Sequence, residues 1–146
     1  MVDLHYQNIS EIPGLDSEFL FSWYTEVCII EKKELGMVNV ILVNDEEILE
    51  VNQVYLQHDY YTDIITFDYC EGDVIIGDLY ISVDTVKSNS LKFGTDVSDE
   101  FKRVLVHGIL HLCGYGDKTD EDEKNMRLKE DEMLNLIVSR ETILTL

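Results

Sequence analysis

The segment from Ser98 to Cys113 constrains the fold more than any other, because it is predicted to form a helix that is apolar on almost every side. It reads SDEFKRVLVHGILHLC, with Ser98 as a capping residue and acidic residues in the first turn. Apolar side chains surround the predicted helix from Val104 to Leu112, so it must lie inside a core rather than on a surface. A chain of 146 residues has room for one such core, and we expect a single domain over residues 1–146.

The rest of the chain is predicted to alternate between strands and helices, without a linker or an internal repeat. Strands are expected at residues 2–9, 37–43, 64–69 and 74–82, and only the last two, joined by a turn at 71–73, are expected to be antiparallel. Helices are expected from Asp16 or Ser17 to near Gly36, from Asn44 through Tyr55, from about Asp84 to Phe93 and from about Asp120 to Val138. This order predicts an α+β domain of the α/β type, with a mixed sheet of about four strands flanked by helices.

The charge of the chain restricts its partners. Thirty acidic residues against eleven basic ones give a formal net charge of -19 and a pI near 4.3. Such a molecule repels polyanions at long range, which disfavours loose, sequence-independent binding of nucleic acid. A role on nucleic acid would therefore need a local basic patch, a metal ion or a partner protein.

The sequence predicts a cytoplasmic protein that does not bind membranes. No apolar run approaches the roughly 18 residues of a membrane span, and the N-terminus lacks the basic and apolar regions of an export signal. Cys28, Cys70 and Cys113 are odd in number and lie in apolar contexts. They are expected to be reduced core residues, as in a reducing compartment.

Two histidines inside the apolar helix predict a metal site. His107 and His111 are four residues apart, so they differ by about 40° around the helix and by about 6 Å along it, and both can reach one ion. Gly114 can end the helix in a left-handed conformation, and Gly116 allows a further turn that brings Asp117 back toward the histidines. Two nitrogens and a carboxylate with an open position are typical of catalytic zinc, although iron or manganese can bind a similar set.

The spacing HxxxHxxGxxD also resembles that of the metzincin peptidases, but one position argues against peptide hydrolysis. Those enzymes carry a glutamate, their general base, directly after the first histidine, and this chain has Gly108 there. Without that carboxylate the peptidase mechanism lacks its proton acceptor. The motif therefore predicts metal-assisted hydrolysis of another kind of bond.

The sequence resembles the YbeY family, bacterial metal-dependent endoribonucleases of rRNA maturation, whose signature is HGxLHLxGYDH. The matching segment here is HGILHLCGYGD, from His107 to Asp117, and the resemblance extends over roughly residues 40–135. Other positions that match the family's pattern are Asn52, Tyr55, Asp59, the block 62–67, the strand 77–82, Val106, Asp120, Glu123, Met126, Glu130 and Leu134.

This resemblance implies a mixed four-stranded sheet flanked by helices, one zinc ion per chain and a cytoplasmic role. It implies cleavage of single-stranded RNA by a zinc-activated water at the 3′ end of small-subunit 16S rRNA, and a part in ribosome quality control. The implied partners are rRNA and the small ribosomal subunit, with ribosomal proteins or an assembly GTPase as further candidates. The implied metal ligands are His107, His111 and Asp117.

Three of the chain's departures from the family's pattern bear on the predicted function or on a nearby loop. Asp117 replaces a histidine, which keeps a ligand but makes the site more negative. Leu56 stands where the family usually has an arginine thought to serve the RNA, so the cation must come from elsewhere. Tyr61 replaces a proline and is expected to alter only a loop.

No residue is a clear general base, and the remaining candidates are weaker. His58 is the first candidate for the missing cation, with Lys102 and Arg103 more remote. Asp63 could orient a ligand histidine or cap a turn. Three tyrosines could stack on unpaired bases or simply pack in the core: Tyr60, Tyr61 and Tyr115.

Two other functions stay open at this point. A non-catalytic ribosome-assembly factor with a structural zinc is favoured by the charge of -19 and by Leu56. A zinc peptidase is favoured by the histidine spacing and opposed by Gly108. An open fourth coordination position would argue against a purely structural metal.

Overall fold

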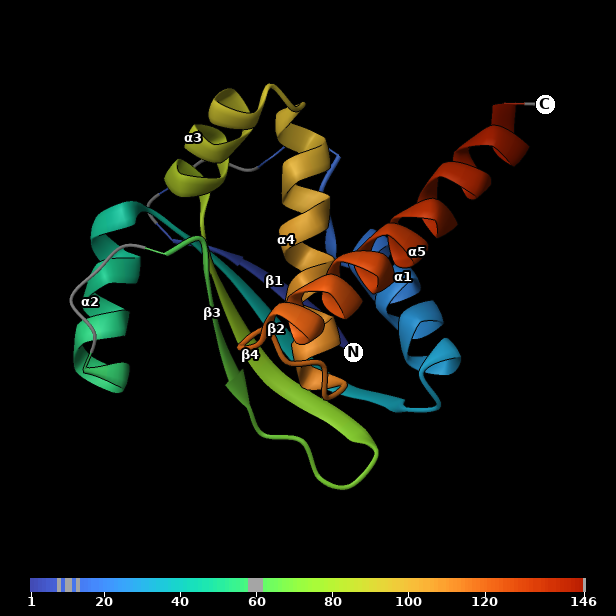
Figure 1. Ribbon diagram of the computed structural model, residues 1–146, viewed down its shortest axis with the longest axis horizontal. Helices are drawn as coiled ribbons and strands as arrows, with labels where there is room; N and C mark the ends of the chain where they lie inside the picture. Colours follow the sequence, from blue (N-terminus) through green and yellow to red (C-terminus); the bar gives the residue numbers. More distant parts are fainter. Residues whose placement is uncertain (8, 10–11, 13, 58–61, 146) are drawn as a thin grey trace.

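The computed structural model describes residues 1–7, 9, 12, 14–57 and 62–145, with the backbone alone for 138–145. Strands and helices alternate along the described chain much as the apolar spacing predicts (Figure 1). The elements are β1 (Val2–Tyr6), α1 (Ser17–Ile30), β2 (Glu34–Val43), α2 (Asp45–Leu56), β3 (Ile64–Asp68), β4 (Val74–Ser82), α3 (Val83–Phe93), α4 (Val97–Leu112) and α5 (Asp120–Thr145).

The strands form one mixed sheet in the order β1-β2-β4-β3. β1 pairs with β2 and β2 with β4 in parallel, whereas β3 and β4 are antiparallel. The turn between β3 and β4 passes through Gly72, whose φ of +58° lies in the region that glycine favours. The predicted α+β class, the mixed four-stranded sheet and its single antiparallel pair are confirmed.

Helices cover both faces of the sheet, and α4 lies at the centre. α1 contacts β1 and β2, α4 contacts β3 and β4, and α5 packs over α4 and α1 (Figure 1). α2 lies against β3 and β4 on the other face, where Ile48 meets the β2 side chains Ile41 and Val43. The predicted core helix is confirmed, because the side chains of Phe101, Val104, Leu105, Val106, Ile109, Leu110 and Leu112 are all buried.

α4 can lie close to the sheet because glycines stand at the contact points. A Cβ atom on Gly108 would be 2.8 Å from a methyl carbon of Leu79 and 2.9 Å from one of Ile64. A Cβ atom on Gly77 in β4 would likewise lie 2.8 Å from a methyl carbon of Leu112. Both distances are shorter than real carbon contacts, so side chains there would push α4 away from the sheet.

Several predicted boundaries are wrong. α1 ends at Ile30 rather than near Gly36, because Lys32 takes the positive φ of 59° that ends the helix, and Gly36 lies inside β2. α4 is capped by Asp96 rather than Ser98, since the Asp96 side chain accepts the Ser98 N–H at 2.8 Å.

Strand and helix lengths differ as well. β1 ends at residue 6 rather than 9, β2 begins at residue 34, and β3 stops at residue 68. α5 extends to residue 145, beyond the expected end at 138. Such ends depend on tertiary contacts as much as on local sequence.

Two remaining expectations concern cysteines and membranes. Cys28 is buried, Cys70 and Cys113 are partly buried, and all three are free thiols. Over the described residues, no helix has the length and apolar character that crossing a bilayer requires.

Candidate metal centre

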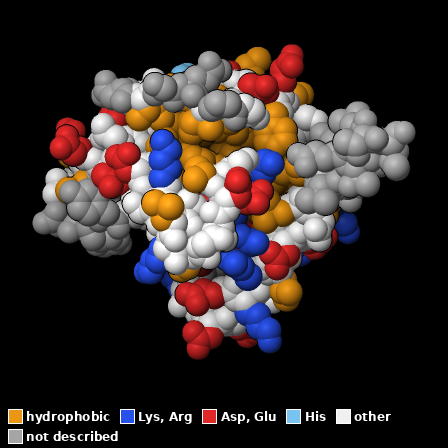
Figure 2. All heavy atoms as spheres, turned by 90° about the horizontal axis from the view of Figure 1, so that it is seen from above, with side chains coloured by type: hydrophobic (Ala, Val, Ile, Leu, Met, Phe, Trp, Pro, Cys, Tyr) orange, Lys and Arg blue, Asp and Glu red, His pale blue; other side chains and the backbone are white. Residues whose placement is uncertain are grey.

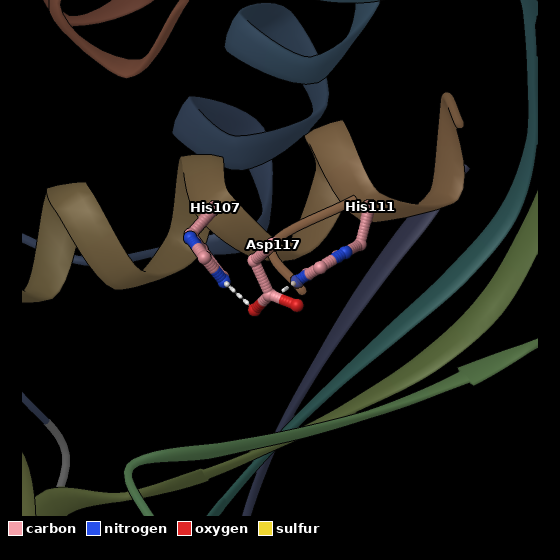
Figure 3. A group of neighbouring side chains, drawn as sticks. All are labelled: His107, His111 and Asp117. Carbon is pink, nitrogen blue, oxygen red and sulfur yellow. Dashed lines mark hydrogen bonds and ion pairs between the residues drawn. The ribbon is translucent and has the colours of Figure 1, made fainter. Parts of the chain in front are cut away.

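The side chains of His107, His111 and Asp117 converge beside α4, on the side that faces β3 (Figure 3). Oδ2 of Asp117 lies 3.2 Å from Nε2 of His111 and 3.6 Å from Nε2 of His107. One donor atom from each residue lies within 4.8 Å of the other two. The three ligands expected from the sequence are therefore brought together.

The turn that returns Asp117 is a Schellman motif at the end of α4. The Gly114 N–H donates to the carbonyl of His111 at 3.0 Å, and the Tyr115 N–H donates to the carbonyl of Leu110 at 3.1 Å. Gly114 has φ +110°, which lies in the region that favours glycine. The helix thus ends at Leu112, one residue after His111, and the chain doubles back past the histidines as predicted.

The same turn orients His111. Nδ1 of His111 lies 2.8 Å from the carbonyl oxygen of Tyr115. A carbonyl can only accept, so Nδ1 carries the proton and Nε2 presents its lone pair toward Asp117. The backbone therefore sets the tautomer that metal binding requires.

His107 is oriented by a residue of another helix. Its Nδ1 lies 2.7 Å from Oε2 of Glu130 on α5. Arg103 donates from Nη1 to Oε1 of Glu130 at 2.8 Å, and from Nη2 to Asp131 at the same distance. The Glu130 side chain is only 6% exposed, so this carboxylate is held between a histidine and a guanidinium inside the protein.

Burial and these contacts act in opposite directions on the pKa values. Burial by itself would raise the pKa of Glu130, but its bonds to His107 and Arg103 hold that pKa below its usual range. Burial would lower the pKa of His107, but the bond to Glu130 and the charges of Glu130 and Asp63 keep it above its ordinary value. Burial also raises the pKa of Asp63, against a smaller opposite effect of His107.

The arrangement fits a transition metal. Nitrogen and oxygen donors about 2.0–2.2 Å from a tetrahedral zinc ion are about 3.3–3.6 Å apart, close to the separations of Asp117 from both imidazoles. The imidazoles are 24% and 23% exposed and the Asp117 side chain 45%, so the site is accessible to solvent. Three ligands with an accessible side are typical of catalytic rather than structural zinc.

The comparison with known proteins identifies the family. The family model described as endoribonuclease YbeY matches residues 6–138. This chain belongs to the YbeY family. A Phocaeicola vulgatus protein named Endoribonuclease YbeY is 49% identical over 127 residues, which cover 87% of this chain and 92% of that protein. One of the same name from Flavobacterium psychrophilum is 46% identical over 136 residues, covering 93% and 96%.

A solved structure supports the same fold. The solution structure of TM1509 from Thermotoga maritima is 32% identical, with a TM-score of 0.65 over 96% of this chain and 93% of that one. The YbeY match also extends beyond the residues 40–135 over which the sequence resemblance was expected.

The YbeY arginine position is occupied by an apolar side chain in the structure. Leu56 is 40% exposed at the end of α2. Arg103, one candidate for the missing cation, is engaged by two carboxylates, and Lys102 lies beside it on α4. His58, the first candidate for that cation, lies outside the described residues, and so do Tyr60 and Tyr61, which were candidates for stacking on bases.

Asp63 and Tyr115 lie close to the centre. The Asp63 carboxylate accepts backbone N–H groups at the start of β3, as a turn cap would, and it also acts electrostatically on His107. It does not orient His107, because Nδ1 of that ring is bonded to Glu130. The Tyr115 hydroxyl bonds to Glu31.

Sequence reasoning assigned no role to Glu130, although a signal was present. Glu130 lies on the same helical stripe as the core residues Met126, Met133 and Ile137, all of them buried. A carboxylate among core positions requires a charged or hydrogen-bonded partner. Glu130 has two such partners, His107 and Arg103.

The structure also explains the glycine at the peptidase position. Gly108 faces the sheet and not the metal ligands, with Leu79 and Ile64 directly over its Cα. A glutamate at this position would collide with the core instead of reaching a bound water. The peptidase alternative therefore lacks a base at this position for a physical reason.

Proposed function

We propose that this chain is a metal-dependent endoribonuclease that cleaves single-stranded rRNA at the 3′ end of small-subunit 16S rRNA, in ribosome maturation and quality control. The observation that carries the proposal is the convergence of two imidazole Nε2 atoms and a carboxylate, with each Nδ1 bonded to a fixed acceptor. Membership in the YbeY family supports RNA as the substrate.

We propose one zinc ion per chain as the cofactor. His107, His111 and Asp117 would hold it, and zinc supplies Lewis acidity and lowers the pKa of a coordinated water to about 7. Glu130 and the Tyr115 carbonyl keep the two imidazoles in the tautomer that binds metal. Asp63 is our candidate for the proton acceptor, since burial raises the pKa of its carboxyl above the ordinary value and the charge of His107 acts on it.

The expected setting is the cytoplasm, with the small ribosomal subunit as the principal partner. Ribosomal proteins or an assembly GTPase are further partners in this proposal. The net charge of -19 supports contacts with basic proteins, because opposite charges accelerate their association.

Metal content and RNA cleavage, measured on the same variants, test the proposal. We expect about one zinc per chain in wild-type protein purified without chelators, and loss of zinc together with cleavage of a 16S rRNA precursor fragment in His111→Ala and Asp117→Ala. Asp63→Asn should retain zinc and lose cleavage. His5→Ala is the matched control, because the His5 side chain is exposed and hydrogen-bonds to Asn39 rather than to any of the three candidate ligands. Cleavage retained in His111→Ala would refute the proposal.

The second candidate is a non-catalytic assembly factor with a structural zinc. Leu56 in place of an arginine favours it, since a cation that would stabilise phosphate charge is absent there. Stoichiometric zinc without cleavage, even with ribosomes added, would establish this alternative.

A further inference from the structure

Helices leave part of one sheet face uncovered in the described chain. α1 and α4 pack on one side of the sheet, and α2 is the helix that the described residues place on the other side, against β3 and β4. The β3–β4 hairpin extends past α2 (Figure 1). On the α2 side the strands present a set of side chains that are not buried, and we call this surface the open face: Asp3, Asn39, Phe67, Tyr69, Asp78 and Tyr80.

The chain that builds the open face lacks basic residues. No lysine or arginine occurs between Lys33 and Lys87, a stretch that contains β2, α2, β3 and β4 and twelve acidic residues. This stretch therefore accounts for twelve of the nineteen net negative charges. The basic residues belong to the remaining segments, and the view onto α3 and the start of α4 shows Lys and Arg side chains among the acidic ones (Figure 2).

Polar side chains form a line across three strands of the open face. Nδ2 of Asn39 donates to Oδ1 of Asp78 at 3.0 Å, and Nε2 of His5 lies 3.4 Å from Oδ1 of Asn39. An amide donor orients a carboxylate without neutralising its charge. The Asp78 carboxylate is therefore held in place, and its charge can act on a cation in solution.

Aromatic side chains stand beside Asp78. The ring centroid of Phe67 lies 5.8 Å from that of Tyr55 on α2 and 5.7 Å from that of Tyr80, and both pairs meet edge to face. Burial and the nearby groups Asp78, Tyr55 and Tyr69 raise the pKa of the Tyr80 hydroxyl, so these groups surround it. Tyr55 and Tyr69 are 68% and 56% exposed, so their rings are accessible to a partner.

This combination of carboxylates and rings fits a flat cation. A guanidinium group stacks on an aromatic face and donates to a carboxylate in a fixed geometry, whereas an ammonium group is a compact point charge. Nucleic acid is disfavoured as the occupant, because its phosphates would be repelled by the carboxylates of this stretch.

We propose that the open face docks an arginine-rich segment of a partner protein, with guanidinium groups stacked on Tyr55 and Tyr69 and paired with Asp3 and Asp78. The metal ligands belong to α4 and the turn after it, and α4 packs on the opposite side of the sheet. Docking on the open face therefore does not involve the metal ligands, and the inference goes beyond the proposed function without depending on RNA cleavage.

Equilibrium binding of two fluorescein-labelled peptides, nona-arginine and nona-lysine, to the zinc-loaded full chain tests this surface. The peptides carry equal charge, so a difference between them reports stacking rather than overall attraction. The variants are Asp78→Asn and Tyr69→Ala. Their matched controls are Asp99→Asn, at an exposed position in the first turn of α4, and Phe93→Ala, whose ring is 63% exposed at the end of α3. Melting temperatures verify that each variant is folded.

We expect the wild type to bind nona-arginine about two- to fivefold more tightly than nona-lysine, the size of an exposed cation–π contact. Tyr69→Ala should reduce this preference by weakening the binding of nona-arginine alone. Asp78→Asn should weaken the binding of both peptides about two- to fivefold, the size of an exposed charge pair. Asp99→Asn and Phe93→Ala should bind both peptides as the wild type does at about 0.15 M salt, where distant charges are screened.

Equal affinities of the wild type for the two peptides, or equal effects of Asp78→Asn and Asp99→Asn, would overturn the inference, since overall charge would then explain the binding. A dimer detected by sedimentation and lost in Tyr69→Ala would assign the face to a second copy of the chain, which also overturns it. Loss of RNA cleavage in Tyr69→Ala would overturn it by placing RNA on this face. A wild-type protein that binds nona-arginine as expected but does not cleave RNA would instead count against the proposed function alone.

Discussion

Residue by residue, the metal centre depends on which nitrogen of each imidazole carries the proton. His111 is fixed by a backbone carbonyl and His107 by the carboxylate of Glu130. Of these two partners only the carboxylate carries a charge that a substitution can remove, and Arg103 holds it in place. Partners of this kind typically contribute about 10–100-fold to metal affinity.

Glu130→Gln should change both the strength and the pH dependence of zinc binding. Zinc binds the neutral imidazole, so in the wild type its affinity falls as pH drops through the pKa of His107, which Glu130 keeps above the ordinary value. Removing the negative charge lowers that pKa, so the fall should begin at lower pH in the variant. At high pH the variant should bind zinc about 10–100-fold more weakly.

Competition with a chelating dye across a pH series measures both effects. Asp131→Asn is the control, since Asp131 bonds to Arg103 but not to His107. An unchanged pH at which affinity begins to fall would show that Glu130 does not set the protonation of His107.

Among the secondary-structure elements, α4 and its C-terminal turn determine the geometry of the metal centre. Gly114→Ala should destabilise the protein by about 1–2 kcal/mol, because φ of +110° is strained for alanine. It should also weaken zinc binding about tenfold, because the Tyr115 carbonyl that orients His111 would shift.

Gly94→Ala provides the matched comparison for that turn. Gly94 caps α3 with φ +67°, and neither glycine has an atom within 4 Å of the Cβ that alanine would add. Both variants should melt a few degrees lower, and only Gly114→Ala should lose zinc affinity. Equal zinc affinities of the two variants would show that the turn at Gly114 does not determine zinc binding.

Gly108→Ala tests the close contact between α4 and the sheet. The added methyl group would lie 2.8 Å from Leu79, so we expect a loss of about 1–3 kcal/mol in the free energy of unfolding. In a Leu79→Ala background the same change should cost much less, because the obstructing methyl groups are absent. Additive effects in this double-mutant cycle, measured by denaturant unfolding, would exclude the steric explanation.

The whole molecule is dominated by its net charge of -19, which acts on any RNA before contact. Raising ionic strength from about 0.01 to about 0.15 M shortens the screening length from about 30 to about 8 Å and weakens this repulsion. The association rate constant with single-stranded RNA should therefore increase over that range, measured by stopped-flow fluorescence. A basic nuclease would show the opposite trend, and a decrease here would mean that a local positive field governs the encounter.

Local signals in the sequence determined much of this protein. The capping box of Asn44 and Glu47, the β3–β4 hairpin and the helical spacing of His107 and His111 each depend on residues close in the chain, and the structure contains all of them. The turn to Asp117 also follows from local chemistry, since glycine adopts positive φ without strain.

Only the tertiary structure determined which partners the side chains of the site contact. Glu130 is 23 residues from His107 in sequence, and nothing local to either indicates that they are bonded. Arg103 is bound by carboxylates of another helix, and Gly108 is required by side chains of the sheet. The last residue of α1 and the capping residue at the start of α4 also differ from expectation, because several neighbouring residues have similar propensities there and packing selects among them. Long-range burial brings together partners that no local spacing predicts. The sequence could therefore predict the three candidate ligands, whose convergence the structure shows, but not the partners that orient them.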